Sequence, residues 1–142
     1  MQLTHYTDYS LRVLIYLSLK KQRPATISEI ANYYKISRNH LVKIVHNLSN
    51  LGYIVTIRGK GGGMHLAYPA NEINIGDVVR NVEPHFHVVE CFSKHHSECK
   101  IEPICKLKRI LQTATNTFLA ELDQHSLQDV ISNRNLKNIF LV

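Results

Sequence analysis

The sequence predicts a mainly α-helical winged helix-turn-helix fold with a small β wing, followed by a long C-terminal dimerisation helix. Two helical patterns joined by a turn of about three residues give the first observation. The second is a pair of strand-forming runs around a glycine-rich turn, and the third is a long amphipathic pattern near the C-terminus. We therefore expect a winged helix-turn-helix domain over residues 1–83, a cysteine loop over 84–105, and a dimerisation helix with a C-terminal segment over 104–142.

Composition limits the classes of function. The chain has 142 residues, is 44% hydrophobic and carries a formal net charge of +6, which favours nucleic acid or another anionic partner. Its longest apolar stretch, residues 11–19, is interrupted by Arg12 and Ser18 and is too short to span a bilayer. It also lacks the flanking features of a secretory signal. We expect a cytoplasmic protein with no membrane partner, in which cysteines serve metal binding or redox sensing rather than disulfides.

The first two helices are expected at residues 8–20 and 26–35. The first is apolar on most of its faces, so a partner subunit is expected to cover part of it. Thr26 and Glu29 have the spacing of a capping box, in which each side chain accepts from an orphan amide at the helix start. The helical spacing of the first segment rests on Leu11, Leu14, Ile15 and Leu19.

The next helix is expected to begin after Ser37, which would cap it, and to end at Gly52. Its outer face is polar, basic and rich in amides, as in a recognition helix. A helical hairpin with a solvated face would have the same pattern up to this point. The inner stripe consists of Leu41, Ile44, Val45, Leu48 and Leu51.

The following segment favours a winged helix. Strand-forming runs at residues 53–58 and 64–68 enclose Gly59, Lys60 and three further glycines. Glycines at such a tip allow positive φ and a close approach to phosphate, whereas a flexible loop on an unrelated hairpin is the alternative. Arginine and asparagine can contact base edges, and arginine can enter a narrow minor groove. The expected DNA-contacting residues are Ser28, Ser37, Arg38, Asn39, His40, Lys43, Arg58, Gly59, Lys60, Gly61 and Gly62.

Three helical patterns complete the chain. Asn74 is expected to cap a short helix that ends near Val82, and Ser126 with Asp129 indicates another capped helix near the C-terminus. Between them, residues 104–124 predict a helix about 30 Å long. Its apolar surface is broader than one stripe, so we expect a second subunit to cover it. The main stripe consists of Leu107, Leu111, Ala114, Phe118 and Leu122.

All three cysteines lie in the intervening loop, as Cys91, Cys99 and Cys105. No tight Cys-x2-4-Cys knuckle of the kind typical of zinc sites is present, and the wider spacing suits an iron–sulfur cluster. Cubane clusters normally take four ligands, so one ligand must be solvent or another side chain. The candidates are Asp8, His85, His87, Glu90, His95, His96 and Glu98.

Other uses of three thiols remain open. They are structural zinc, a redox disulfide with one thiol left over, and three unliganded cysteines. A thiol oxidoreductase is a further alternative, but the sequence lacks a Cys-x-x-Cys motif, so we do not expect an enzyme.

The chain resembles the Rrf2 family of winged-helix regulators over essentially its whole length. The resemblance is closest to the nitric-oxide-sensitive repressors of that family. The recognition-helix and wing runs are typical of the family, and the cysteine trio is typical of its cluster-binding members. The matching runs are residues 1–4, 7–9, 37–44, 51–53, 58–60, 62–63, 75–80, 118–119 and 126–130, with the three cysteines.

This resemblance implies a homodimer that binds a double-stranded DNA operator and represses genes for nitric-oxide detoxification. It also implies a [4Fe-4S] cluster on Cys91, Cys99 and Cys105, through which nitric oxide as the signal releases the DNA. Asp8 matches the position that can supply a fourth ligand from the other subunit. A plain helix N-cap is the alternative role for Asp8.

One departure from the family pattern leaves the cluster type open. The interval between Cys91 and Cys99 is longer than is typical, and it contains His95 and His96. Another kind of regulator in the family controls iron–sulfur homeostasis and combines a histidine with three cysteines around a [2Fe-2S] cluster. A [2Fe-2S] cluster with a histidine ligand is therefore the alternative.

Overall fold

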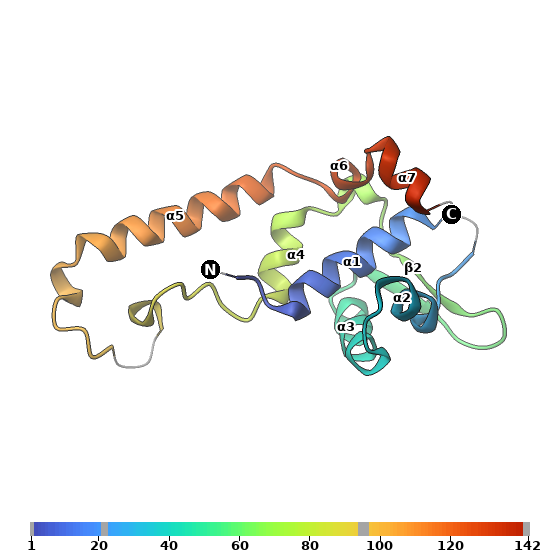
Figure 1. Cartoon of the computed structure of the whole chain (residues 1–142), viewed down its shortest axis with the longest axis horizontal. Coiled ribbons are helices and arrows are strands. Elements are labelled where there is room, and N and C mark those ends of the chain that lie inside the picture. Colours follow the sequence, from blue (N-terminus) through green and yellow to red (C-terminus); the bar gives the residue numbers. More distant parts are fainter. Residues whose placement is uncertain (1, 21–22, 94–96, 141–142) are drawn as a thin grey trace.

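The computed structural model describes residues 2–20, 23–93 and 97–140. A winged helix-turn-helix forms one end, and helix α5 leads away from it toward the other (Figure 1). The predicted fold class, mainly helical with a two-stranded sheet, is confirmed. The elements are α1 (His5–Leu19), α2 (Ile27–Tyr34), α3 (Arg38–Asn50), β1 (Ile54–Ile57), β2 (Gly63–Leu66), η1 (Ala70–Glu72), α4 (Ile75–Val82), η2 (Glu90–Phe92), η3 (Glu102–Ile104), α5 (Lys106–Asp123), α6 (Leu127–Ile131) and α7 (Arg134–Phe140).

Helix α1 runs through the centre of the core. It begins at His5, earlier than the sequence predicts, because the Thr4 hydroxyl accepts a hydrogen bond from the Thr7 amide at 3.3 Å. Thr4 is therefore the N-cap, and the alternative role of Asp8 as the N-cap is wrong. The Tyr6 hydroxyl donates to the Lys43 carbonyl at 3.1 Å and links α1 to α3.

The helix-turn-helix consists of α2 and α3. The capping box of α2 is present, with Thr26 and Glu29 each accepting from the other's amide. Ser37 occupies the N-cap position of α3, but its hydroxyl makes no capping hydrogen bond, so that part of the prediction is wrong. The inner stripe of α3 is buried as predicted except for Leu51, which follows the last helical residue and is 39% exposed.

The wing is a short antiparallel hairpin that follows Gly52, whose φ of 81° ends α3 as expected. Ile54 pairs with Leu66 and Ile57 with Gly63, so both strands are shorter than the sequence predicts. The hairpin is also bound to the α1–α2 connection, because Ala25 and Met64 exchange backbone hydrogen bonds of 2.9 and 2.7 Å.

The C-terminal part contains a largely exposed helix, α5, and a helix that returns to the core, α6. Among the described residues of α5, only Thr115 is buried. This helix begins at Lys106 because the preceding residues form the 3₁₀ turn η3, which contains Pro103. Helix α6 has the predicted capping box and buries Leu127 against α1, whereas α7 was not predicted. Within the described residues, no helix is both long and apolar enough to cross a bilayer.

Candidate nucleic-acid interface and cysteine loop

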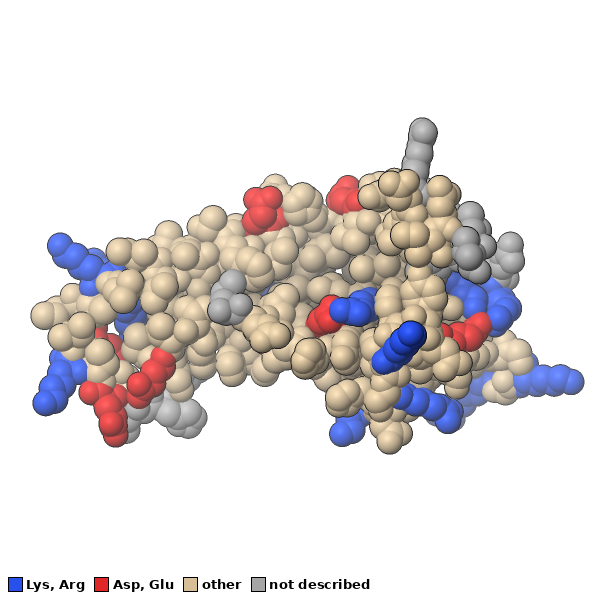
Figure 2. Space-filling view, viewed as in Figure 1, with Lys and Arg blue, Asp and Glu red and all other residues tan. Residues whose placement is uncertain are grey.

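The N-terminal half of α3 presents a polar, basic surface. Five residues predicted to contact DNA lie together there and are exposed: Ser37, Arg38, Asn39, His40 and Lys43. Ser28 is exposed on the neighbouring helix α2. Figure 2 shows Lys and Arg side chains gathered over the end of the molecule that carries α3 and the hairpin. The structure therefore brings the predicted base-reading residues onto one accessible helix.

Helix α1 supports this surface from behind. Besides the bond from Tyr6 to the Lys43 carbonyl, the Tyr9 ring lies 6.3 Å from the His40 ring at a tilt of 50°. Tyr6 is part-buried, and this burial raises the pKa of its hydroxyl, against the lowering effect of a hydrogen bond with Asn47. The hydroxyl thus stays protonated at neutral pH and is available as a donor to α3.

The wing tip is a tight glycine turn that carries two cations. Gly59 and Gly61 have φ values of 94° and 78°, in the left-handed region that L side chains rarely adopt. The Gly62 amide donates to the Gly59 carbonyl at 3.0 Å, and a Cβ on Gly62 would lie 2.9 Å from that oxygen. Arg58 and Lys60 are exposed on this turn. Four of the five predicted wing residues therefore lie at an accessible tip, and the fifth, Gly62, is half-buried behind them.

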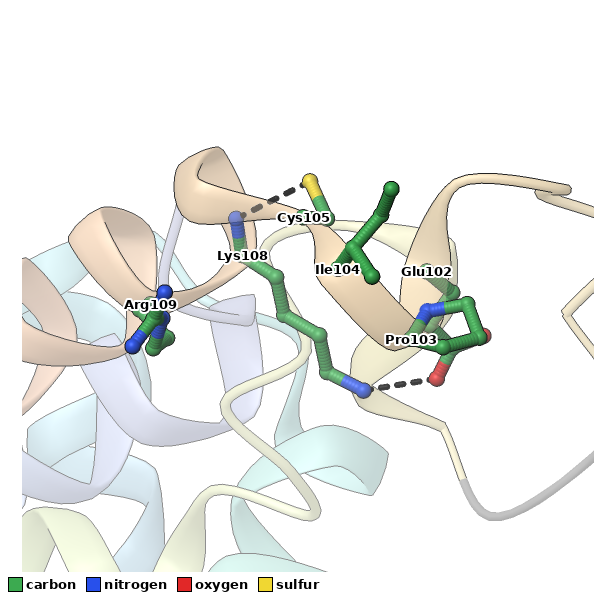
Figure 3. A pocket seen from close by; sticks show the side chains of 6 residues that line it. All are labelled: Glu102, Pro103, Ile104, Cys105, Lys108 and Arg109. Carbon is green, nitrogen blue, oxygen red and sulfur yellow. Dashed lines mark hydrogen bonds and ion pairs between the residues drawn. The ribbon is translucent and has the colours of Figure 1, made fainter.

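The three cysteines are free thiols at different places along the loop. Cys91 is half-buried in the turn η2, and Cys99 is exposed. Cys105 is the N-cap of α5, where its Sγ accepts a hydrogen bond from the Lys108 amide at 3.4 Å (Figure 3). The last cysteine is thus attached directly to the start of the exposed helix.

An open pocket of about 700 Å³ adjoins Cys105. The Lys108 ammonium and the Glu102 carboxylate form an ion pair there, with Nζ and Oε1 2.6 Å apart (Figure 3). This hydrogen bond raises the pKa of Lys108 and lowers that of Glu102, and the charges of Cys91 and Cys105 also act to raise the Lys108 pKa. A cation therefore stands near two of the three thiols. The pocket is lined by Glu102, Pro103, Ile104, Cys105, Lys108 and Arg109.

The donor chemistry of the loop fits an iron–sulfur cluster, because thiolates are its usual ligands. Within the described part of the chain, however, no three His, Cys, Asp or Glu side chains lie close enough together to hold a metal ion. Cluster binding would have to draw the three thiols together. Lys108 is a residue that the sequence reasoning missed, although its place three residues after Cys105 was a usable signal.

The candidate fourth ligands fall into three groups. His95 and His96 lie outside the described residues. The imidazoles of His85 and His87 stack at 4.6 Å, and the Glu90 carboxylate accepts from the Glu98 amide at 3.5 Å. Asp8 is on α1, where it forms an ion pair with Arg12. Within this one chain, none of the described candidates joins the thiols in a metal-binding group.

A buried carboxylate that the sequence reasoning missed connects the loop to α1. Glu83 directly precedes the loop and is only 8% exposed. Its Oε2 accepts hydrogen bonds from the Thr4 amide at 3.1 Å and the Thr4 hydroxyl at 3.0 Å, and from the Thr7 hydroxyl. The partners are 76 and 79 positions away in sequence, and no local pattern identifies them. The start of the cysteine loop is therefore tied to the first turn of α1.

Comparisons with known proteins agree with this architecture. Residues 3–133 match the Rrf2 family, which is described as an iron-dependent transcriptional regulator. The chain is 48% identical to the HTH-type transcriptional regulator NsrR of Bacillus subtilis (strain 168), over 94% of this chain and 92% of that protein. It is also 48% identical to NsrR of Bacillus licheniformis, over 95% of both chains. The solved structure of CymR (YrzC), the global cysteine regulator of B. subtilis, superposes with a TM-score of 0.73 at 26% identity, covering 93% of this chain and 97% of that one. The chain is a transcriptional regulator that belongs to the Rrf2 family.

Proposed function

We propose that this regulator is a homodimeric repressor that binds an operator in double-stranded DNA and releases it in response to nitric oxide through an iron–sulfur cluster. The observation that carries the proposal is the joining of two features in one chain. A winged helix exposes a basic recognition surface, and three free thiols lie in the loop that precedes the exposed helix α5. Two similar relatives are named HTH-type transcriptional regulator NsrR, which supports the DNA-binding part of this role.

The DNA-reading step is assigned to α3 and the wing. Arg38 and Asn39 would make bidentate contacts with base edges in the major groove, beside Ser37, His40 and Lys43. Arg58 would enter the minor groove, while Lys60 and the amides of the glycine turn would contact phosphate. Ser28, on α2, would contact the phosphate backbone of the DNA. These roles follow from exposure and charge at positions where winged helices meet DNA.

The homodimer is inferred from the uncovered apolar face of α5. Four large apolar side chains are more than half exposed in this region. Leu107 (60%) and Ile110 (63%) lie in the first turns of α5, and Ile101 (59%) and Ile104 (81%) lie in the segment just before it. Large apolar side chains exposed so close together in the chain are typical of an interaction site. A second copy of α5 would cover it, which gives residues 104–142 their dimerising role and leaves residues 1–83 as the DNA-binding part.

Cys91, Cys99 and Cys105 would hold the cluster, with Asp8 of the partner subunit as the fourth ligand. When bound, a [4Fe-4S] cluster would supply an iron site that nitric oxide can attack. A carboxylate is a weak, exchangeable ligand for iron, and a ligand from the partner would couple the loop to the dimer's geometry. The loop ends in α5 and is tied by Glu83 to α1, so its closure and opening would change the position of α3.

Anaerobic purification followed by iron and sulfide analysis tests the cluster. About four irons per chain would support [4Fe-4S], and about two would favour the histidine-ligated [2Fe-2S] alternative and a role in iron–sulfur homeostasis. A colourless protein would overturn the cluster proposal and favour a zinc-bound or a metal-free regulator. Metal analysis distinguishes these two alternatives.

Gel shifts with promoter DNA test the switch. Nitric oxide should release DNA from the cluster-loaded protein. Alanine at any of the three cysteines should abolish this response, whereas Lys100→Ala, at an exposed position in the same loop, should leave it intact. A triple cysteine variant that still binds DNA and still responds to nitric oxide would contradict the assignment.

A further inference from the structure

The C-terminal end of α5 is fixed to the N-terminal end of α4. The guanidinium of Arg80 forms a two-point ion pair with the Asp123 carboxylate, in which Nη2 and Oδ2 lie 2.8 Å apart. The Asn74 side-chain amide donates to the Asp123 carbonyl at 2.7 Å, and the Ile75 amide donates to the His125 carbonyl at 2.9 Å. Four hydrogen bonds therefore converge where the exposed helix meets the winged helix.

Gly76 makes room for this ion pair. A Cβ at this position would collide with the Asp123 carboxylate and lie 2.8 Å from Arg80 Nη1. Gly76 is buried in the second position of α4, where a glycine is a poor helix former. The glycine is thus explained by the close approach of the carboxylate and not by helix formation.

The ion pair is better suited to fixing an angle than to stabilising the fold. Both side chains are 38% exposed, and ion pairs at such sites contribute little to stability. A guanidinium that binds both oxygens of a carboxylate, in contrast, fixes their relative orientation. The site therefore determines how α5 is oriented relative to α4.

A small rotation at this joint has a large effect at the other end of α5. The helix has 18 residues, so it is about 27 Å long. A rotation of roughly 10° would displace its far end by about 5 Å, which exceeds the rise of about 3.4 Å per base pair in DNA. The exposed Leu107 and Ile110 are near that far end, whereas Leu119 and Leu122, near the joint, pack on the core. Figure 1 shows the start of α5 extending away from the winged helix.

We propose that Gly76, Arg80 and Asp123 form a joint that selects the half-site spacing of the operator. By fixing the angle of α5, the joint sets the distance between the two recognition helices of the dimer. The inference rests on the proposed dimer and on its reading of a two-half-site operator, but it does not depend on the cluster. It assigns a role in specificity to residues that do not contact DNA.

Selection from a random-sequence duplex library tests the joint, because it reports half-site sequence and spacing separately. Asp123→Asn removes the charge, and Arg80→Lys keeps the charge but loses the two-point geometry. Gly76→Ala adds a Cβ that displaces the Asp123 carboxylate. The matched control is Glu121→Gln, which alters an exposed carboxylate two residues away on the same helix. Circular dichroism melts establish that each variant is folded.

The wild type and the control should enrich paired half-sites at one spacing. The three variants should enrich the same half-site sequence with spacings that are shifted or spread. Their preference for the wild-type spacing over one changed by a single base pair should fall from about tenfold to about threefold or less. If folded Asp123→Asn and Arg80→Lys proteins keep the wild-type spacing, the proposed role of the joint is wrong. The proposal that a dimer reads two half-sites would then still stand. If the wild type enriches only single half-sites, both the reading of two half-sites by a dimer and the role of the joint in setting their spacing are wrong.

Discussion

Asp8 and Arg12 form a two-point ion pair across one turn of α1. Arg12 Nε donates to Oδ1 at 2.9 Å and Nη2 donates to Oδ2 at 2.8 Å, so both carboxylate oxygens are engaged. This hydrogen bonding raises the pKa of Arg12, and its guanidinium also lies 5.7 Å from the centre of the Tyr9 ring and 5.8 Å from that of Tyr34. For Asp8 to bind a cluster in the partner subunit, this pair would have to open at least in part. Arg12 and the proposed cluster would therefore compete for the same carboxylate.

Asp8→Ala and Arg12→Ala should have different effects if Asp8 is a cluster ligand. The ion pair is more than 40% exposed on each side, so its loss should change the free energy of unfolding by no more than about 1 kcal/mol in either variant. Only Asp8→Ala should alter the absorbance spectrum of the loaded protein and speed its loss of iron. Anaerobic absorbance and iron release measure both effects. Identical spectra for the two variants and the wild type would contradict the ligand role.

The Glu83 carboxylate should be important for stability because it is buried and accepts from three donors. Thr7→Val removes one donor while keeping the shape of the side chain, and we expect it to lower the free energy of unfolding by about 1–3 kcal/mol. Thr7→Ser keeps the hydroxyl and is the matched control. Urea denaturation measures the difference. Equal stability of the valine and serine variants would show that the Thr7 hydroxyl does not support Glu83.

The elements that could be predicted from the sequence are those fixed by residues close together in the chain. The capping boxes of Thr26 with Glu29 and of Ser126 with Asp129 each involve residues three positions apart, and both are present. The glycine turn of the wing is also a local feature, because the φ angles of Gly59 and Gly61 require it. Apolar spacing within each helix, local hydrogen bonding and backbone sterics therefore carried most of the fold prediction.

The features that could not be predicted depend on contacts between distant segments. Glu83 finds its donors on α1, and Arg80 finds Asp123 43 positions later. In each case, the tertiary fold brings together residues whose local patterns are unremarkable. The start of α1 is a different kind of error. The apolar spacing begins later than the helix, and the capping by Thr4 was overlooked although it is local.

The stability of the protein should depend on Glu29 in acid. Burial acts to raise the pKa of this carboxyl, but hydrogen bonds from Lys20, Thr26 and Arg23 outweigh it and lower the pKa from 4.5 to about 2. Because the folded state binds the proton less readily than the unfolded state, this stabilisation is complete above about pH 4.5 and is lost as the pH falls toward 2. Because the Glu29 side chain is 25% exposed, its ionisation contributes about 1–3 kcal/mol to the free energy of unfolding.

Glu29→Gln should therefore flatten the pH dependence of the free energy of unfolding between about pH 4.5 and 2. Urea denaturation at a series of pH values measures it. Glu72→Gln, which changes an exposed carboxylate in η1, is the control and should keep the wild-type slope. A Glu29→Gln curve parallel to that of the wild type would rule out the hydrogen-bonded carboxylate as a source of acid sensitivity.

The wing should contribute to DNA binding in two distinguishable ways. Arg58→Ala should weaken operator binding sharply and reduce discrimination among sequences, because an arginine in a narrow minor groove responds to DNA shape. Lys60→Ala should weaken binding to all DNA sequences similarly. It should also reduce the magnitude of the slope of log affinity against log salt concentration by about 1, as expected for one lost phosphate contact. Fluorescence anisotropy between about 50 and 200 mM salt measures both effects.

The control is Lys106→Ala, which removes an exposed cation at the start of α5, outside the winged helix. It should leave the slope unchanged. Because the two cations are only two residues apart on the same glycine turn, equal behaviour of Arg58→Ala and Lys60→Ala would mean that the wing acts only as a basic patch. Unchanged operator binding by Arg58→Ala would rule out the minor-groove role.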